Sequence, residues 1–223
     1  MKPFEFIKAA STEEAVAALA EHGPGIRILA GGTDLLVDLK HAGQSPGVVM
    51  DVSGIDDLGA ISVDDDGLHI GAGATHTAIM TDPLIAEHAP AMIDAAHTVG
   101  AVQTRNLGTI GGNLVTCVPS MDSGPVLVAL EADVILAGAS GIRRLALTEF
   151  FVGPRKTILA AGEMLVDIVI PKANLGKPAG FIKFGGKSGR PSLAKVGQNR
   201  KPENPCPEAS RSSMAVCSSR AKA

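Results

Sequence analysis

Two pairs of adjacent glycines carry the most specific chemical signal in this sequence. The first pair lies in AGGTDLL (residues 30–36), at the end of the apolar run IRILA (26–30), and the second lies in TIGGN (109–113). Glycine lets another group approach the main chain closely, and successive N–H groups in such a turn bind anions, especially beside a helix N-terminus. Two such backbone cradles would suit an extended ligand with a diphosphate in its middle.

Each glycine pair also has a purely structural explanation. The first can be a strand-to-helix turn with Thr33 or Asp34 as the helix N-cap, and the second an irregular turn. Asn113 offers both a donor and an acceptor, as a phosphate or a heterocycle needs. Asp122, in PSMDSGP, can cap the helix expected near Pro125 or accept hydrogen bonds from a ribose or ring group. The residues alone leave these alternatives open.

Other polar residues give weaker signals. GAGATH (71–76) begins like a dinucleotide-binding fingerprint, but His76 replaces its third glycine and no βαβ context follows, so we reject that motif. The spacing of His76, His88 and His97 favours surface or helix histidines over ligands. Arg105 can pair with a phosphate or an acidic partner surface, although a loop salt bridge is the favoured explanation.

Composition limits the class of protein. With 223 residues, 45% of them hydrophobic, the chain has a globular composition, and its net charge of −3 and lack of Trp and Tyr argue against a nucleic-acid partner. We expect no signal peptide and no membrane span. The three cysteines lack metal-ligand spacing and are expected to be free thiols in a reducing cytoplasm. They are Cys117, Cys206 and Cys217.

The first part of the chain predicts a small α/β unit. A capped helix is expected over 11–23, a strand over 26–30, a helix over 33–43 and a strand over 47–52. This order predicts a parallel pairing of the two strands.

The pattern changes near Ile55. Two strands joined by an Asp-rich turn at 64–67 come first, and a helical stretch interrupted by Pro83 and Pro90 follows. Residues 101–125 lack regular periodicity and are expected to form a long functional loop. A helix and a strand over 126–138 and a strand over 162–171 complete the predicted elements.

The composition changes again near residue 197. The segment from there to 223 is rich in Pro, Ser, Lys and Arg, shows no apolar periodicity and predicts no regular structure. A frameshift or truncation near this point is one hypothesis for the change.

Four motifs, in this order, together resemble those of a known family. They are AGGTDLL (30–36), IGAGATHT (70–77), RNLGTIGGNL (105–114) and MDSGPVLVALEADV (121–134). Over about residues 1–196 the chain resembles the FAD-binding medium subunit of molybdenum hydroxylases, the family of xanthine dehydrogenase and carbon monoxide dehydrogenase. Flavin enters through this resemblance, whereas the glycines alone indicate a diphosphate.

The resemblance implies an α+β fold of the PCMH (vanillyl-alcohol-oxidase-like) type. Two FAD-binding subdomains would span 1–55 and 56–173, an incomplete C-terminal α/β domain would begin over 174–196, and 197–223 would be an aberrant tail. No catalytic acid or base is implied. The implied FAD contacts are Ile28, Leu29, Ala30, Gly31, Gly32, Thr33, Asp34, Thr109, Ile110, Gly111, Gly112, Asn113, Asp122, Leu165 and Lys183.

The resemblance also implies a role in electron transfer within a cytoplasmic hetero-oligomer. Electrons would pass from the [2Fe–2S] clusters of a small subunit through FAD to NAD, a quinone or oxygen, while a molybdopterin-binding large subunit hydroxylates the substrate. The altered C-terminal segment leaves a second hypothesis open, a non-catalytic remnant that serves as an assembly surface. A stand-alone flavin oxidase is disfavoured because no substrate domain and no acid–base residues are evident.

Overall fold

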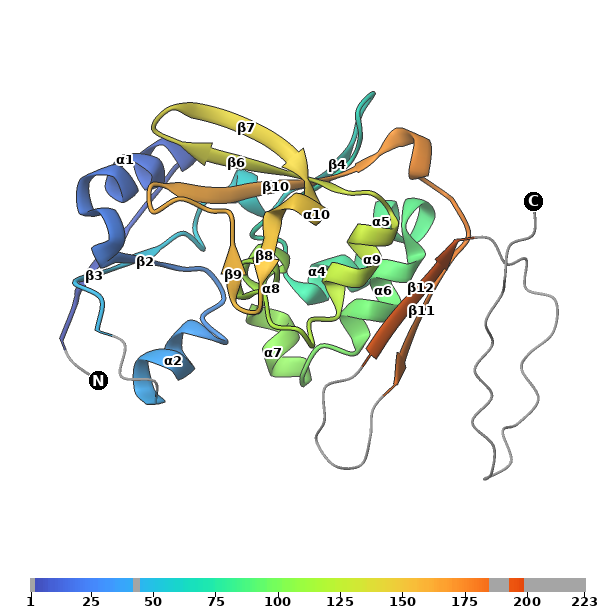
Figure 1. Cartoon of the computed structure of the whole chain (residues 1–223), viewed down its shortest axis with the longest axis horizontal. Coiled ribbons are helices and arrows are strands. Elements are labelled where there is room, and N and C mark those ends of the chain that lie inside the picture. Colours follow the sequence, from blue (N-terminus) through green and yellow to red (C-terminus); the bar gives the residue numbers. More distant parts are fainter. Residues whose placement is uncertain (1–2, 42–44, 185–192, 199–223) are drawn as a thin grey trace.

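The computed structural model describes residues 3–41, 45–184 and 193–198 (Figure 1). Two β-sheets organise most of this part of the chain, and a group of short helices packs against the larger sheet. No helix within the described ranges is long and apolar enough to cross a lipid bilayer.

The N-terminal unit contains a three-stranded parallel sheet in the order β1-β3-β2. Ser11 caps the first helix by accepting a hydrogen bond from the Glu14 N–H. The predicted helix–strand–helix–strand order and the parallel pairing are confirmed, and β1 is an addition that the sequence did not predict. The elements are β1 (Glu5–Lys8), α1 (Thr12–His22), a 3₁₀ turn (Gly23–Gly25), β2 (Ile26–Leu29), α2 (Leu35–His41) and β3 (Val48–Asp51).

The second unit contains a five-stranded antiparallel sheet in the order β4-β5-β10-β6-β7. The Asp-rich turn between β4 and β5, the strand in 126–138 and the strand in 162–171 are confirmed. The strands are β4 (Ile61–Val63), β5 (Gly67–Gly71), β6 (Asp133–Gly138), β7 (Gly141–Ala146) and β10 (Glu163–Pro171).

Short helices cover one side of this sheet (Figure 1). As predicted, Pro83 and Pro90 divide the helical stretch, because each proline occupies the first position of a new helix. The carboxylate of Asp82 caps the helix that begins at Pro83 by accepting hydrogen bonds from the N–H groups of Leu84 and Ile85. The helices of the second unit are α3 (Asp56–Gly59), which packs through Leu58 into a separate, smaller core, and α4 (His76–Thr81), α5 (Pro83–His88), α6 (Pro90–His97), α7 (Val102–Leu107), α8 (Ile110–Thr116), α9 (Ser123–Ala129) and α10 (Leu147–Phe150).

The main hydrophobic core lies between these helices and the sheet. Side chains such as Ile70 of β5, Ile79 of α4, Leu114 of α8 and Leu136 of β6 are fully buried there. A smaller core joins the parallel sheet to the larger one, because Met50 of β3 belongs to the same cluster as residues of β6 and β10. The two sheets are therefore packed together through apolar side chains.

The expectation of a long loop over 101–125 is wrong. This segment holds α7, α8 and the start of α9. Its helices have six or seven residues, too few to show an apolar period, and bonds from elsewhere in the chain support them. The N–H groups of Ile110 and Gly111 donate to the carbonyls of Ala74 and Ala72, so tertiary contacts rather than sequence pattern fix this region.

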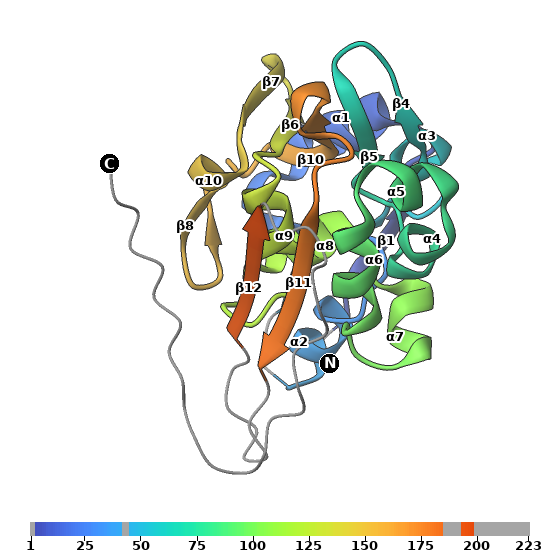
Figure 2. The ribbon, with the colours of Figure 1, turned by 90° about the vertical axis from the view of Figure 1, so that its right-hand side faces the viewer.

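The last described elements form two small antiparallel pairs. Figure 2 shows β11 and β12 beside α6 and α9, which they contact. The predicted irregular segment that starts near residue 197 lies, beyond residue 198, outside the described residues. These remaining elements are β8 (Phe151–Gly153), β9 (Lys156–Thr157), a 3₁₀ turn (Lys172–Asn174), β11 (Ala179–Phe184) and β12 (Leu193–Gln198).

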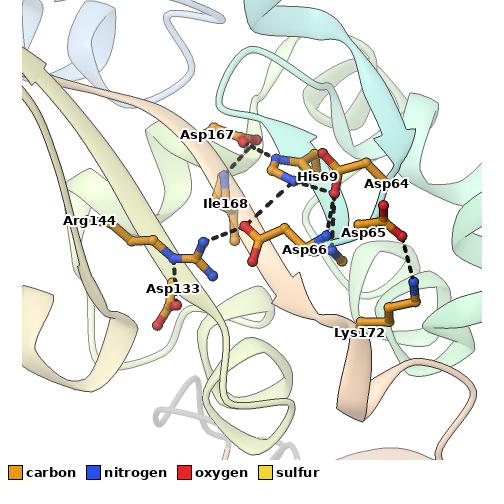
Figure 3. A network of polar contacts seen from close by, with 10 residues as sticks. Asp64, Asp65, Asp66, His69, Asp133, Arg144, Asp167, Ile168 and Lys172 are labelled. Atoms are coloured by element: carbon orange, nitrogen blue, oxygen red, sulfur yellow. Dashed lines mark hydrogen bonds and ion pairs between the residues drawn. The ribbon is translucent and has the colours of Figure 1, made fainter.

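A polar network ties the β4–β5 hairpin to the rest of its sheet (Figure 3). His69 lies at its centre, with Nδ1 2.6 Å from Asp167 Oδ2 on β10 and Nε2 3.3 Å from Asp64 Oδ1 in the turn. Arg144 on β7 bridges Asp66 and Asp133, and Lys172 binds Asp65. The turn is thereby held to three other segments of the chain.

Burial is the largest single influence on His69 and lowers its pKa, but the hydrogen bonds and charges of Asp167 and Asp64 outweigh it. The net effect is a pKa raised above the ordinary value of 6.5. For the Asp167 carboxyl, burial acts in the other direction and raises the pKa, and the hydrogen bond and charge of His69 only partly oppose this effect. The protonated imidazole is thus favoured in the folded state.

This arrangement predicts a pH-dependent contribution to stability. A raised folded-state pKa means that the contribution of His69 is complete below pH 6.5 and is lost as the pH rises through the folded value. Urea unfolding at pH 6, 7 and 8 should show His69→Gln destabilised by on the order of 1 kcal/mol at pH 6, with the difference from wild type shrinking at higher pH. His97→Gln, an exposed helix variant, should show no such trend. A difference that grows with pH would contradict this assignment.

Candidate functional site

A cavity of about 660 Å³ lies where the loop after β2, the loop after β5, helix α8 and the start of β10 meet. Residues from segments far apart in the sequence share its wall. The sequence-predicted site residues in this wall are Ile28, Ala30, Gly31, Gly32, Thr33, Asp34, Thr109, Gly111, Gly112, Asn113 and Leu165. Four others, Leu29, Ile110, Asp122 and Lys183, are not part of the wall.

The first glycine pair presents unpaired backbone to the cavity. Neither Gly31 nor Thr33 makes a hydrogen bond to any other described residue, through backbone or side chain. Gly32 has a φ of 71°, a conformation that L side chains rarely adopt. This turn therefore leaves N–H groups and a hydroxyl available to a ligand.

Gly31 is also a point at which the two units approach each other closely. A Cβ placed on Gly31 would lie 1.8 Å from the carbonyl oxygen of Leu107, at the end of α7. Any side chain there would push the β2–α2 loop away from the α7–α8 connection. The glycine thus closes one side of the cavity.

The N-cap alternative for this turn finds no support in the structure. Thr33 makes no hydrogen bond, and among the described residues none is found for the Asp34 side chain. Helix α2 instead begins with main-chain bonds, since Leu36 N–H donates to the Gly32 carbonyl and Asp38 N–H to that of Asp34.

The second glycine pair works differently from the first. The N–H groups of Ile110, Gly111 and Gly112 donate to Ala74 O, Ala72 O and Thr109 Oγ1, respectively. A Cβ on Gly111 would lie 2.6 Å from the Ala72 carbonyl oxygen. The expectation of a second open backbone cradle is therefore wrong at these three amides, because two of them hold α8 against the loop after β5 and the third bonds to the Thr109 N-cap of α8.

Asp122 lies close to the cavity and is engaged in an ion pair. It occupies the N-cap position of α9 but makes no capping bond, and its carboxylate accepts from Lys183 Nζ at 2.8 Å. The neighbouring Ser123 hydroxyl donates to Asn113 Oδ1 at 2.5 Å. The Asp122–Lys183 pair is thus adjacent in sequence to a residue that contacts Asn113 in the cavity wall.

Two polar residues behave differently from their sequence-based expectations. Arg105 forms no salt bridge in the described region, and its Nη1 instead donates to the carbonyls of His97, Val99 and Gly100 at the end of α6 and just after it. His76 is helical as expected but is not at the surface, since only 2% of it is exposed. His88 is half-buried and His97 is exposed, as expected for helix histidines.

His76 lines the cavity and is the site residue that the sequence reasoning missed. Its Nδ1 is buried without a hydrogen-bond partner among the described residues. Burial is the main cause that lowers the pKa of His76 to about 4, opposed by the charge of Asp122 and aided by that of Arg105. The only sequence signal was its place in the motif IGAGATHT.

Comparison with known proteins agrees with this geometry. Residues 2–173 match the family described as FAD binding domain in molybdopterin dehydrogenase. The chain is 37% identical to the nicotinate dehydrogenase FAD-subunit of Eubacterium barkeri over 188 residues, which cover 82% of this chain and 64% of that one. It is 34% identical to the glyceraldehyde dehydrogenase medium chain of Sulfolobus acidocaldarius, with 86% and 68% covered.

Two solved structures have a similar overall fold. The carbon monoxide dehydrogenase of Hydrogenophaga pseudoflava matches with a TM-score of 0.80 at 31% identity, over 86% of this chain and 68% of that one. The quinoline 2-oxidoreductase of Pseudomonas putida matches with the same TM-score and identity, over 86% and 67%. The chain thus spans about two thirds of the length of these relatives.

The buried His76 predicts a second pH effect, of opposite sign to that of His69. Its lowered folded-state pKa means that the unfolded chain binds more protons between pH 4 and 6.5, so stability falls as the pH drops through this range. The loss should approach about 3 kcal/mol at pH 4. Urea unfolding of wild type and His76→Phe between pH 4.5 and 7 measures it. The variant should have a shallower slope, and equal slopes would show that His76 is not buried in neutral form.

Proposed function

Because the chain belongs to the family of FAD-binding domains in molybdopterin dehydrogenases, we propose that it is the FAD-carrying, electron-transferring subunit of a molybdenum hydroxylase complex. FAD is the cofactor of this family. The observation that carries the proposal is the unpaired backbone of Gly31 and Thr33 in the wall of a cavity of about 660 Å³. We also assign the fold to the PCMH type, with FAD-binding subdomains over 1–55 and 56–173.

The residues of the cavity fit FAD in their chemistry. N–H groups in the Gly31–Thr33 turn are free donors, as a diphosphate requires, and the glycines keep side chains away from it. Thr109, Gly112 and Asn113 lie on another part of the wall and add polar contacts. Leu165 supplies an apolar surface of the kind that a flavin ring needs.

When bound, FAD would supply the redox chemistry, accepting electrons from the [2Fe–2S] clusters of a small subunit and passing them to NAD, a quinone or oxygen. The role of the chain is then to bind and orient the cofactor. Asp122 and Lys183 lie outside the cavity wall, so in this proposal they would meet the flavin where it extends beyond the cavity, as an ion pair 2.8 Å apart whose charges balance each other.

The partners in this proposal are a molybdopterin-binding large subunit and the iron–sulfur small subunit. Support comes from relatives that are named as subunits or medium chains of dehydrogenases. We place the complex in the cytoplasm, in keeping with a sequence that predicts free thiols. The hydroxylated substrate would be selected by the large subunit.

The change in composition near residue 197 favours a second candidate function. In this alternative the chain binds little flavin and serves as an assembly surface for the other two subunits. Flavin content and assembly distinguish the two candidates, because the first requires both and the second requires assembly alone.

Co-expression with the molybdopterin-binding and iron–sulfur subunits of the same organism tests the proposal. The purified complex should contain about one FAD for each copy of this chain, and the flavin absorbance should bleach when the iron–sulfur subunit is reduced. A complex that assembles without flavin, even after incubation with FAD, would establish the alternative. A chain that binds FAD but never joins the other subunits would contradict the proposed partners and leave the cofactor assignment intact.

A further inference from the structure

His76 is placed where a ligand in the cavity would meet it. It is the first residue of α4, and its main-chain N–H donates to the carbonyl of Gly108, so the backbone at His76 is held beside the α7–α8 connection. A Cβ placed on Gly108 would lie 3.5 Å from His76 Cδ2 and 3.5 Å from Thr33 Oγ1. The bare Cα of Gly108 thus separates the imidazole from the first glycine turn.

The two ring nitrogens of His76 have different surroundings. Nδ1 is shielded from solvent and has no hydrogen-bond partner in the described part of the chain. A buried N–H without an acceptor is rare in proteins, because its desolvation is not compensated. The proton of the neutral imidazole therefore belongs on Nε2, which lies next to Cδ2 on the edge facing Gly108.

The surroundings of the ring also keep it uncharged. It is 2% exposed, and the charges that act on it, those of Asp122 and Arg105, oppose each other. The imidazole is therefore held as a neutral donor close to an anion-binding turn. Such a donor can bind a ligand atom without adding a positive charge to the site.

We propose that His76 is a further FAD-binding residue, which donates its Nε2–H to an oxygen or nitrogen acceptor of FAD in the cavity. This inference rests on the proposed function, because it takes FAD as the occupant. It adds a third binding element, the start of α4, to the first glycine turn and α8. It also gives a role to a polar ring that is buried in the wall of the cavity.

Two substitutions separate the donor from the ring. His76→Phe keeps a planar ring and removes the N–H, whereas His76→Gln keeps an N–H at a similar reach. His97→Phe, on the exposed side of α6, is the matched control. FAD titration by calorimetry should show roughly tenfold weaker binding for His76→Phe, while His76→Gln and His97→Phe stay within a few fold of wild type. Circular dichroism checks that each variant is folded.

Nitrogen NMR of the wild-type chain tests the same inference by reporting on the ring nitrogens themselves. The ¹⁵N resonances of His76, assigned by their loss in His76→Gln, should show the Nε2–H tautomer without ligand. Addition of FAD should shift the Nε2 resonance more than that of Nδ1.

Three results would overturn the inference. They are an Nδ1–H tautomer, an Nε2 resonance that FAD leaves unchanged, or wild-type affinity in folded His76→Phe. A wild-type chain that fails to bind FAD in the same titration would instead refute the proposed function. The two failures are therefore distinguishable in one set of measurements.

Discussion

The close approach of two backbones at Gly31 is the constraint on which the site depends. The turn after β2 lies against the carbonyl of Leu107, so near that a single added carbon would overlap it at 1.8 Å. This contact joins the parallel sheet unit to the helices on the larger sheet and closes the cavity between them. Since the contact needs a residue without a side chain, the first glycine shapes the cavity. Gly31 and Thr33, which make no hydrogen bonds of their own in the described structure, present free donors to it.

The second glycine pair has a complementary role. Its amide groups are occupied by the chain itself, and a glycine is needed at 111 because a Cβ there would lie 2.6 Å from the Ala72 carbonyl oxygen. This packing fixes α8, and with it Asn113, at the cavity wall. Two motifs of similar sequence thus do different work, one leaving backbone donors free and the other using them to position a helix.

Much of the fold follows from local sequence. The capping Ser11, the prolines at 83 and 90 and the Asp-rich turn before Gly67 mark element ends by chemistry that acts within a few residues. Helices α7 and α8 escaped prediction because they are too short to show a period, and α8 also depends on bonds to Ala72 and Ala74. Strand β7 was missed for a related reason. It pairs with β6, but its sequence shows no strong alternation of apolar and polar residues.

Site residues could be predicted from the sequence where glycine marks an unusual backbone conformation. They could not be predicted where packing of the whole fold determines the burial and the partners of a side chain. The glycine turns are visible in the sequence, whereas the burial of His76 depends on packing that spacing cannot show. The partners of Arg105 were also hidden in the sequence. They are main-chain carbonyls that follow α6, which any residue type supplies, so no acidic side chain indicates them.

The most direct test of the account is FAD binding by the purified chain with an alanine at Gly31. Wild type should bind about one FAD, and Gly31→Ala should lose at least tenfold in affinity, because the added methyl group would force the turn away from Leu107. Gly54→Ala, at a position where a Cβ meets nothing within 4 Å, is the control and should bind like wild type. Wild-type affinity in Gly31→Ala would contradict the claim that this backbone contact forms the cofactor site.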